Sequence, residues 1–394
     1  MRHSVPSQRG ADWATAEGGT SVSPLYDPAE LGIKSMLDHE PPSRSWLVDS
    51  FLPTNVVGVL AATGGTGKSF LALQLAISVA TGVSFLDLPV NEPGGVLMLC
   101  AEDDRDEMHR RLVRVVSALE EAGQLTTDHR ALLEQRLFMR SSVGEAVQLT
   151  QETRGRVEPT SVTDRLIALA KHLPPLKLIV LDPVSRFRGD NDENSNMAAT
   201  RFLEQVERLR DATGATVLLP HHVSKSTQAA GGSLEIAGMR GASALADGAR
   251  WVAGMTTMNE RQAKSFSLAP DDAHGHVRLQ SLKQSYGMLS EGRWLRRGPG
   301  GMLVPTELES KAGNTAKARK HHDGRALNEV YQILHKHGAM TVTSLVTKYG
   351  GNDGPLKIGQ KRLRTLLKEA VENGSLSYTD GMRSDQKLIT IGRK

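Results

Sequence analysis

The residues with the clearest chemical meaning form a glycine-rich octapeptide, Ala-Thr-Gly-Gly-Thr-Gly-Lys-Ser, at positions 62–69. It lies between an apolar run typical of a buried strand and an apolar run typical of a helix. Its glycines let the backbone curl until successive N–H groups converge on phosphate oxygens. Lys68 would then reach the β- and γ-phosphates of ATP, and the Ser69 hydroxyl would bind Mg²⁺. The predicted phosphate-binding residues are Thr63, Gly64, Gly65, Thr66, Gly67, Lys68 and Ser69, with Ala62 replacing the usual first glycine.

Two carboxylates end apolar strands further along the chain. Asp182 closes LIVLD, and its position suits a water-mediated contact to the same Mg²⁺. Glu102 closes VLMLCAE and would polarise an attacking water. The alternative is that both are solvated strand caps. Asp103 and Asp104 are interpreted as N-caps of the following helix.

His221 and His222 close a fourth apolar strand. In a parallel sheet this strand end would bring one of the two imidazoles near the γ-phosphate, as a sensor of its presence. The alternative is a pair of ordinary surface histidines. Zinc binding is disfavoured because no further Cys or His follows at ligand spacing.

The strands that carry these side chains are expected at residues 56–62, 94–103, 177–182 and 215–222. Helices are expected between them, at 68–79, 106–122 and 197–213. Short apolar strands alternating with helices predict an α/β fold with a mostly parallel sheet covered on both faces. After residue 250, the runs WVAGM, SFSLA, HVRLQSLKQSY and RWLRR predict further, antiparallel strands.

The length of 394 residues suggests two domains, and the 39% hydrophobic content is sufficient for a sizeable core. The predicted organisation is a flexible polar segment at 1–44, an ATPase core at 45–308, a linker at 309–324 and a small domain at 325–394. Residues 311–394 hold 16 basic and 7 acidic residues, leaving 32 basic and 37 acidic in the rest of the chain. This asymmetry favours a polyanionic partner for the C-terminal part.

Three amphipathic segments and a hairpin follow residue 325, in the order of a winged helix. The third, QKRLRTLLKEA, would be its recognition helix, meeting phosphates beside a DNA major groove. Its expected DNA contacts are Lys361, Arg362, Arg364 and Lys368. The alternative role of such a domain is protein docking or autoinhibition.

No membrane segment is expected, because the most apolar stretch, residues 70–86, is short and interrupted by polar residues. The first residues lack the apolar centre of a signal peptide. With one cysteine, Cys100, a disulfide framework is excluded. These features together predict a cytoplasmic protein.

The motifs GVLAATGGTGKSFLALQLA, VLMLCAEDD, LIVLDPVSRF, LLPHHVSK, MRGASALADGARW and SLKQSYG, taken in this order, resemble those of the RepA-type replicative helicases of plasmids. That family belongs to the RecA/DnaB-like P-loop ATPases, within the AAA family ATPases. The resemblance covers roughly residues 46–305. It implies a Mg²⁺-dependent ATPase that forms a homo-oligomeric ring, a hexamer, and translocates on single-stranded DNA. The C-terminal domain is an addition to the shortest members.

The resemblance also implies roles for individual residues. Glu102 matches the catalytic base, Asp182 the Walker B acid and His222 the γ-phosphate sensor. Arg250, in GARW, matches an arginine finger that acts on the neighbouring subunit's nucleotide, and its alternative is a salt bridge. Lys283, in SLKQSYG, is a second candidate nucleotide-binding cation at the interface.

The segment between Lys225 and Arg240 is rich in Gly, Ala and Ser and contains no aromatic residue. In a ring it would face the channel and contact DNA phosphates through those two cations, and otherwise it is an ordinary surface loop. Three rival functions remain. They are a regulatory ATPase that binds duplex DNA or a protein through the C-terminal domain, a recombinase-like filament and, least favoured, a small-molecule kinase.

Overall fold

The computed structural model describes residues 24–189, 195–223, 243–286, 292–308, 311–351, 353–380 and 387–391. The chain divides into two units, Met1–Ser45 and Trp46–Lys394, and each is described by itself. The described part of the first unit contains a short helix, α1 (Lys34–Asp38), none of whose residues is buried.

A nine-stranded sheet, counted over the described residues, is the centre of the second unit, with the order β13-β12-β11-β10-β3-β9-β8-β4-β5. The six strands from β10 to β5 are parallel to one another, and β11, β12 and β13 extend the sheet in antiparallel fashion. The parallel strands are β3 (Val57–Ala62), β4 (Gly95–Cys100), β5 (Leu137–Ser141), β8 (Leu176–Asp182), β9 (Thr216–His222) and β10 (Trp251–Thr257). The extension consists of β11 (His276–Gln284), β12 (Arg293–Arg297) and β13 (Leu303–Thr306).

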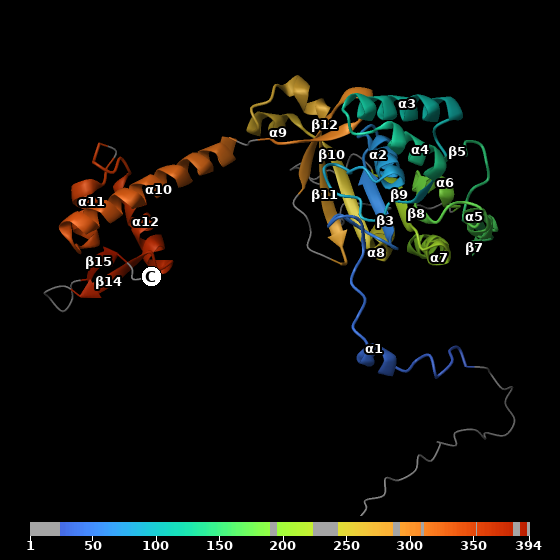
Figure 1. Ribbon diagram of the computed structural model, residues 1–394, viewed down its shortest axis with the longest axis horizontal. Coiled ribbons are helices and arrows are strands. Elements are labelled where there is room, and N and C mark those ends of the chain that lie inside the picture. Colours follow the sequence, from blue (N-terminus) through green and yellow to red (C-terminus); the bar gives the residue numbers. More distant parts are fainter. Residues whose placement is uncertain are drawn as a thin grey trace, which may run out of the picture. The chain divides into compact units, whose positions relative to one another are not determined.

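Helices cover both faces of this sheet (Figure 1). Alternate residues of β3 enter separate cores, so that Leu60 lies in one and Val59 in the other. The first core includes α2 (Lys68–Thr81), α3 (Arg105–Glu121) and α4 (Thr127–Arg136). The second includes α5 (Val162–Ala170), α6 (Val184–Phe187), α7 (Asn196–Thr213) and α8 (Ser243–Gly248). The predicted α/β class with a mostly parallel sheet is confirmed.

Two predictions for the part after residue 250 are wrong. β10 pairs with β11 in antiparallel fashion, but it is parallel to β3, because the chain returns from β9 through α8 before entering it. The run SFSLA does not form a strand. It begins at the end of α9 (Glu260–Ser265), which has an Asn259–Gln262 capping box, and continues through a turn at Ser267 with φ +63°.

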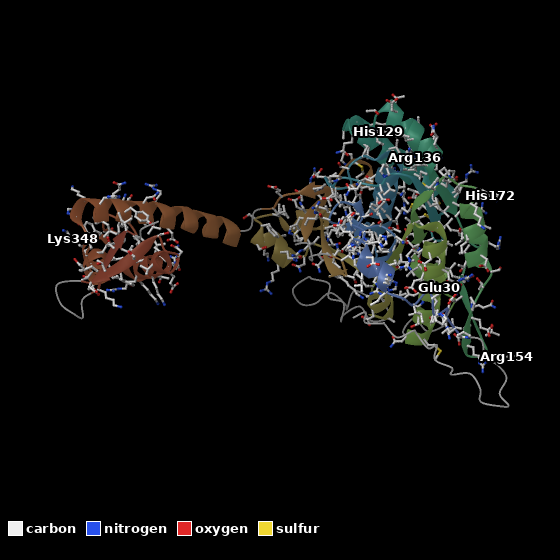
Figure 2. The ribbon with its side chains drawn as sticks, turned by 60° about the horizontal axis from the view of Figure 1, so that its bottom comes forward. Glu30, His129, Arg136, Arg154, His172 and Lys348 are labelled. Carbon is white, nitrogen blue, oxygen red and sulfur yellow. The ribbon has the colours of Figure 1, made fainter. Side chains whose placement is uncertain are left out.

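Several elements carry too little periodicity to be found in the sequence. They include α4, the edge strand β5 and a hairpin of β6 (Thr150–Thr153) and β7 (Arg156–Pro159), whose turn contains Arg154 (Figure 2). The remaining short elements are β1 (Trp46–Val48), β2 (Leu52–Pro53) and the 3-10 helices η3 (Pro270–Gly275) and η4 (Pro299–Gly301).

The C-terminal part has its own apolar core, with Val330, Leu345 and Leu363 fully buried. Its elements are α10 (Lys311–His337), α11 (Val342–Tyr349), α12 (Gln360–Glu372), β14 (Leu376–Asp380) and β15 (Lys387–Ile391). The order of three helices and a hairpin agrees with the sequence pattern. The expected linker is wrong for its described residues, because α10 begins at Lys311. Ala, Lys and Arg are strong helix formers, so this segment becomes helical despite its low apolar content.

None of the helices in the described part of the chain combines the length and the apolar character needed to cross a membrane.

Candidate active site

The phosphate-binding loop connects β3 to α2, the longest helix of the first core after α3. Gly65 and Gly67 have φ angles of +75° and +101°, which residues with a side chain rarely adopt. The Thr66 hydroxyl donates to the Thr63 carbonyl at 2.9 Å and lies 2.9 Å from the Thr63 hydroxyl, so the loop is closed across its base. The octapeptide therefore forms the turn that its glycines predict, directly before the positive end of a helix.

Lys68 is buried at the bottom of this loop. Its Nζ atom lies 3.5 Å from Asp182 Oδ1 and 3.3 Å from His222 Nε2, and the side chains of Lys68 and Asp182 are each only 5% exposed. The contacts arise because β9 lies beside β3, pairing Ala62 with His222, and β8 lies beside β9. The sheet thus brings together three residues that are far apart in the chain.

Glu102 completes this arrangement. Its Oε2 atom lies 3.6 Å from His222 Nε2, and both side chains are about half exposed at the carboxyl edge of the sheet. The same imidazole nitrogen faces Lys68 and Glu102, but it cannot accept a proton from one while donating to the other. The protonation state of His222 therefore selects its partner, Lys68 when Nε2 is an acceptor and Glu102 when Nε2 carries a proton.

His221 points to the opposite side of β9 and is buried. Burial lowers the pKa of His221 to about 4, and the charges of Arg188, Lys68 and His222 act in the same direction. Its Nδ1 atom has no hydrogen-bond partner among the described residues. Of the two histidines, the structure brings only His222 to the loop.

The residues present fit a nucleotide with Mg²⁺. Gly64 and Gly65 are exposed, and the space where a Cβ atom would stand at either one is empty, so the loop is open to a ligand. Mg²⁺ prefers hard oxygen ligands and keeps several from water and phosphate, which the Ser69 hydroxyl and the Asp182 carboxylate would supplement. The described His, Cys, Asp and Glu residues form no cluster of three that could hold a metal ion without such additional ligands.

The two aspartates after Glu102 differ in their contacts. Asp104 is the N-cap of α3, accepting from the Glu107 amide at 2.7 Å, as predicted. Asp103 does not cap the helix but forms an ion pair with Arg111. Burial raises the pKa of Asp103, and the guanidinium of Arg111 opposes this shift.

Arg250 and Lys283 lie at the other edge of the sheet. The Arg250 amide donates to the carbonyl of Val57, the first residue of β3, whereas the phosphate-binding loop starts after its last residue. At about 3.3 Å per residue the separation along the strand is roughly 16 Å. Lys283 donates to the carbonyls of Ala246 and Asp247 at 2.9 and 2.6 Å, and burial lowers its pKa. Neither cation can contact the nucleotide of its own chain.

The expected DNA-contacting residues fall into two groups. Lys225 and Arg240 lie outside the described residues. On α12, Lys361 and Arg364 are exposed, and Lys368 is exposed and 3.7 Å from Glu372. Arg362 contradicts the expectation of an exposed cation, because its guanidinium is 2.5 Å from Asp323 on α10 and 3.2 Å from Glu369.

One residue at the site is missing from the sequence-based prediction. Arg297, the last residue of β12, donates from Nη2 to the carbonyl of Gly65 at 2.7 Å. The only local signal is the basic strand RWLRR, and nothing in it distinguishes Arg297 from Arg293 or Arg296.

The RecA-like sheet and the loop that holds Lys68 against Asp182 define a P-loop ATPase. The chain belongs to the AAA domain family, whose model matches residues 28–228. Two solved structures are similar to it. One is a DnaB-like replicative helicase studied with its interactions with primase, at 13% identity and a TM-score of 0.44, covering 64% of this chain and 58% of that chain. The other is the ATPase domain of a second protein, at 12% identity and a TM-score of 0.45, covering 64% of this chain and 86% of that chain.

Proposed function

We propose that this ATPase is a ring-forming DNA helicase of the RepA type, a hexamer that translocates on single-stranded DNA during replication of a plasmid or mobile element. The observation that carries the proposal is the division of the site between two edges of the sheet. Lys68, Asp182, His222 and Glu102 converge at one edge, whereas Arg250 and Lys283 lie at the other. A complete site with an arginine finger then needs a second subunit, and closed rings satisfy this need for every subunit.

In this proposal Glu102 accepts a proton from the attacking water, and the Lys68 ammonium neutralises charge on the β- and γ-phosphates. Bound Mg²⁺ supplies further charge neutralisation through Ser69 and Asp182. His222 connects the two parts of the site. When a γ-phosphate draws Lys68 away, the imidazole loses that partner and is left with Glu102, so the orientation of the base depends on the nucleotide.

The experiment that tests the helicase is ATP-driven displacement of a labelled strand from a forked duplex. We expect displacement by the parent protein and none by Lys68→Ala. If the parent protein hydrolyses ATP without displacing the strand, alone and in the presence of cell extract, the helicase proposal is wrong.

A second candidate function is a regulatory ATPase that binds duplex DNA through the C-terminal part. The observation that favours it is the exposed pair Lys361 and Arg364 on one helix of a module with its own core. A full-length Lys361→Gln/Arg364→Gln protein should then lose duplex affinity by about tenfold at 0.1 M salt, since each phosphate contact contributes to a strongly salt-dependent affinity. Unchanged ATP hydrolysis in the same protein would separate this role from the motor.

A further inference from the structure

The outer side of the phosphate-binding loop is held by a side chain from the antiparallel extension of the sheet. Arg297 Nη2 donates to the Gly65 carbonyl at 2.7 Å. A Cβ atom placed on Gly67 would lie 3.2 Å from Nη1 of the same guanidinium and 3.4 Å from Leu303 Cδ1. The side chain of Arg297 therefore packs along the loop over both of the glycines that have positive φ angles.

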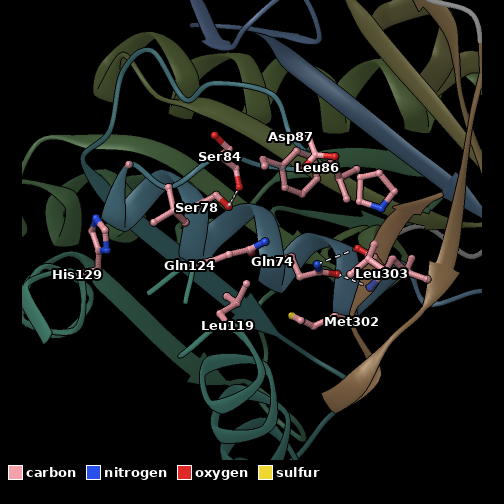
Figure 3. Close-up of a pocket in the computed structure, with 15 residues that line it drawn as sticks. Gln74, Ser78, Ser84, Leu86, Asp87, Leu119, Gln124, His129, Met302 and Leu303 are labelled. Carbon is pink, nitrogen blue, oxygen red and sulfur yellow. Dashed lines mark hydrogen bonds between the residues drawn. The ribbon is translucent and has the colours of Figure 1, made fainter. Parts of the chain in front are cut away.

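This contact is one end of a longer attachment between the extension and α2. Arg293, on the same face of β12, donates to the Leu86 carbonyl at 2.7 Å, in the loop that follows α2. Between them, Gln74 of α2 donates to the Leu303 carbonyl at 3.1 Å and accepts from the Leu303 amide at 2.9 Å, beside a pocket of about 510 Å³ (Figure 3). The extension is thus fixed to α2 without Arg297.

We propose that Arg297 is a positioning residue that sets the phosphate-binding loop for nucleotide. The proposal rests on the nucleotide binding proposed above. The C=O and N–H of a trans peptide point in opposite directions. A donor on the outside of the Gly65 carbonyl therefore turns the Thr66 amide toward the inside of the loop, where phosphate oxygens would lie. In the described structure this amide donates weakly to the Thr63 carbonyl at 3.4 Å, so it can be released to a ligand.

The guanidinium contributes in a second way, through its charge. It stands one peptide group away from the phosphates, on the opposite side of the loop from Lys68. A lysine at position 297 would keep the charge and one donor but lose the forked contact with both glycines. A methionine would lose the charge and the donor while keeping much of the apolar stem.

The test compares four full-length variants with the parent protein: Arg297→Met, Arg297→Lys, Arg296→Met and Lys68→Ala. Arg296 is the matched control, because it is exposed on the opposite face of the same strand. The binding of MgATP is measured by calorimetry, and amide hydrogen exchange is measured for the peptide that contains residues 63–67 in the nucleotide-free protein.

We expect Arg297→Met to bind MgATP about tenfold more weakly and to exchange faster at residues 63–67, with an unchanged melting temperature. Arg297→Lys should recover part of the affinity, and Arg296→Met should match the parent protein. Parental affinity and parental exchange in Arg297→Met would overturn the positioning role. If the parent protein binds no more MgATP than Lys68→Ala, the proposed nucleotide site has failed, and the exchange result alone then decides whether Arg297 orders the loop.

Discussion

His222 and Lys68 lie 3.3 Å apart, Nε2 to Nζ, at the carboxyl edge of neighbouring parallel strands. The same Nε2 is 3.6 Å from Glu102. A single nitrogen thus stands between the lysine that would bind the γ-phosphate and the carboxylate that would activate water. Neighbouring side chains at a strand edge are sufficient to connect nucleotide binding to the catalytic base.

Replacement of Lys68 should remove ATP hydrolysis. The Lys68→Ala protein lacks the buried ammonium aimed at Asp182, so we expect turnover to fall by at least about 10²-fold, the size of effect seen when one preorganised charge-stabilising donor is lost. The measurement is phosphate release at saturating MgATP. Lys177→Ala, which removes a surface ion pair with Glu92, is the control and should retain parental turnover.

Arg250 should act on the neighbouring subunit. Arg250→Ala should bind MgATP normally but hydrolyse it about 10³-fold more slowly, as expected for an arginine finger. Mixing it with Lys68→Ala subunits should restore part of the activity, because mixed rings contain interfaces with both Lys68 and Arg250. Arg261→Ala, an exposed arginine on α9, is the control. Normal hydrolysis by Arg250→Ala at assembling concentrations would disprove the assignment.

The buried imidazole of His221 should make the fold sensitive to acid. Its pKa in the folded chain is about 4, below the unfolded value of 6.5, so the unfolded state binds the extra proton first. This contribution to stability is complete above pH 6.5 and is lost as the pH falls toward 4. Its size is on the order of 3 kcal/mol. Urea unfolding of the parent protein and His221→Leu at pH 7.5, 6 and 5 measures it, and parallel pH profiles would contradict the role of His221.

Arg362 should stabilise the C-terminal part rather than contact DNA. Its loss leaves Asp323, which is only 8% exposed, without its nearest cation. We expect Arg362→Ala to lower the free energy of unfolding of this part by about 1–2 kcal/mol, a partial value because the guanidinium is itself partly solvated. Lys361→Ala should leave it unchanged. The measurement is thermal unfolding followed by hydrogen exchange in α10 and α12, and equal protection in both variants would refute the expectation.

The sequence by itself determined the parts of this protein that depend on neighbours along the chain. The glycine spacing at 62–69 predicts the turn, and the apolar runs that end at Asp182 and His222 predict buried strands with polar residues at one edge. Asp104 is recognisable as a helix cap because its partner, the Glu107 amide, is three residues away.

Only the tertiary structure decided which of two adjacent histidines faces Lys68, because the two differ solely in the side of β9 on which they lie. It also decided that β10 is parallel to β3, that Arg362 is paired with Asp323, and that Arg297 reaches Gly65 across 232 positions of sequence. Each of these depends on strand pairing or packing between distant segments. Local periodicity contains no information on such pairings, since several registers would bury the same apolar residues.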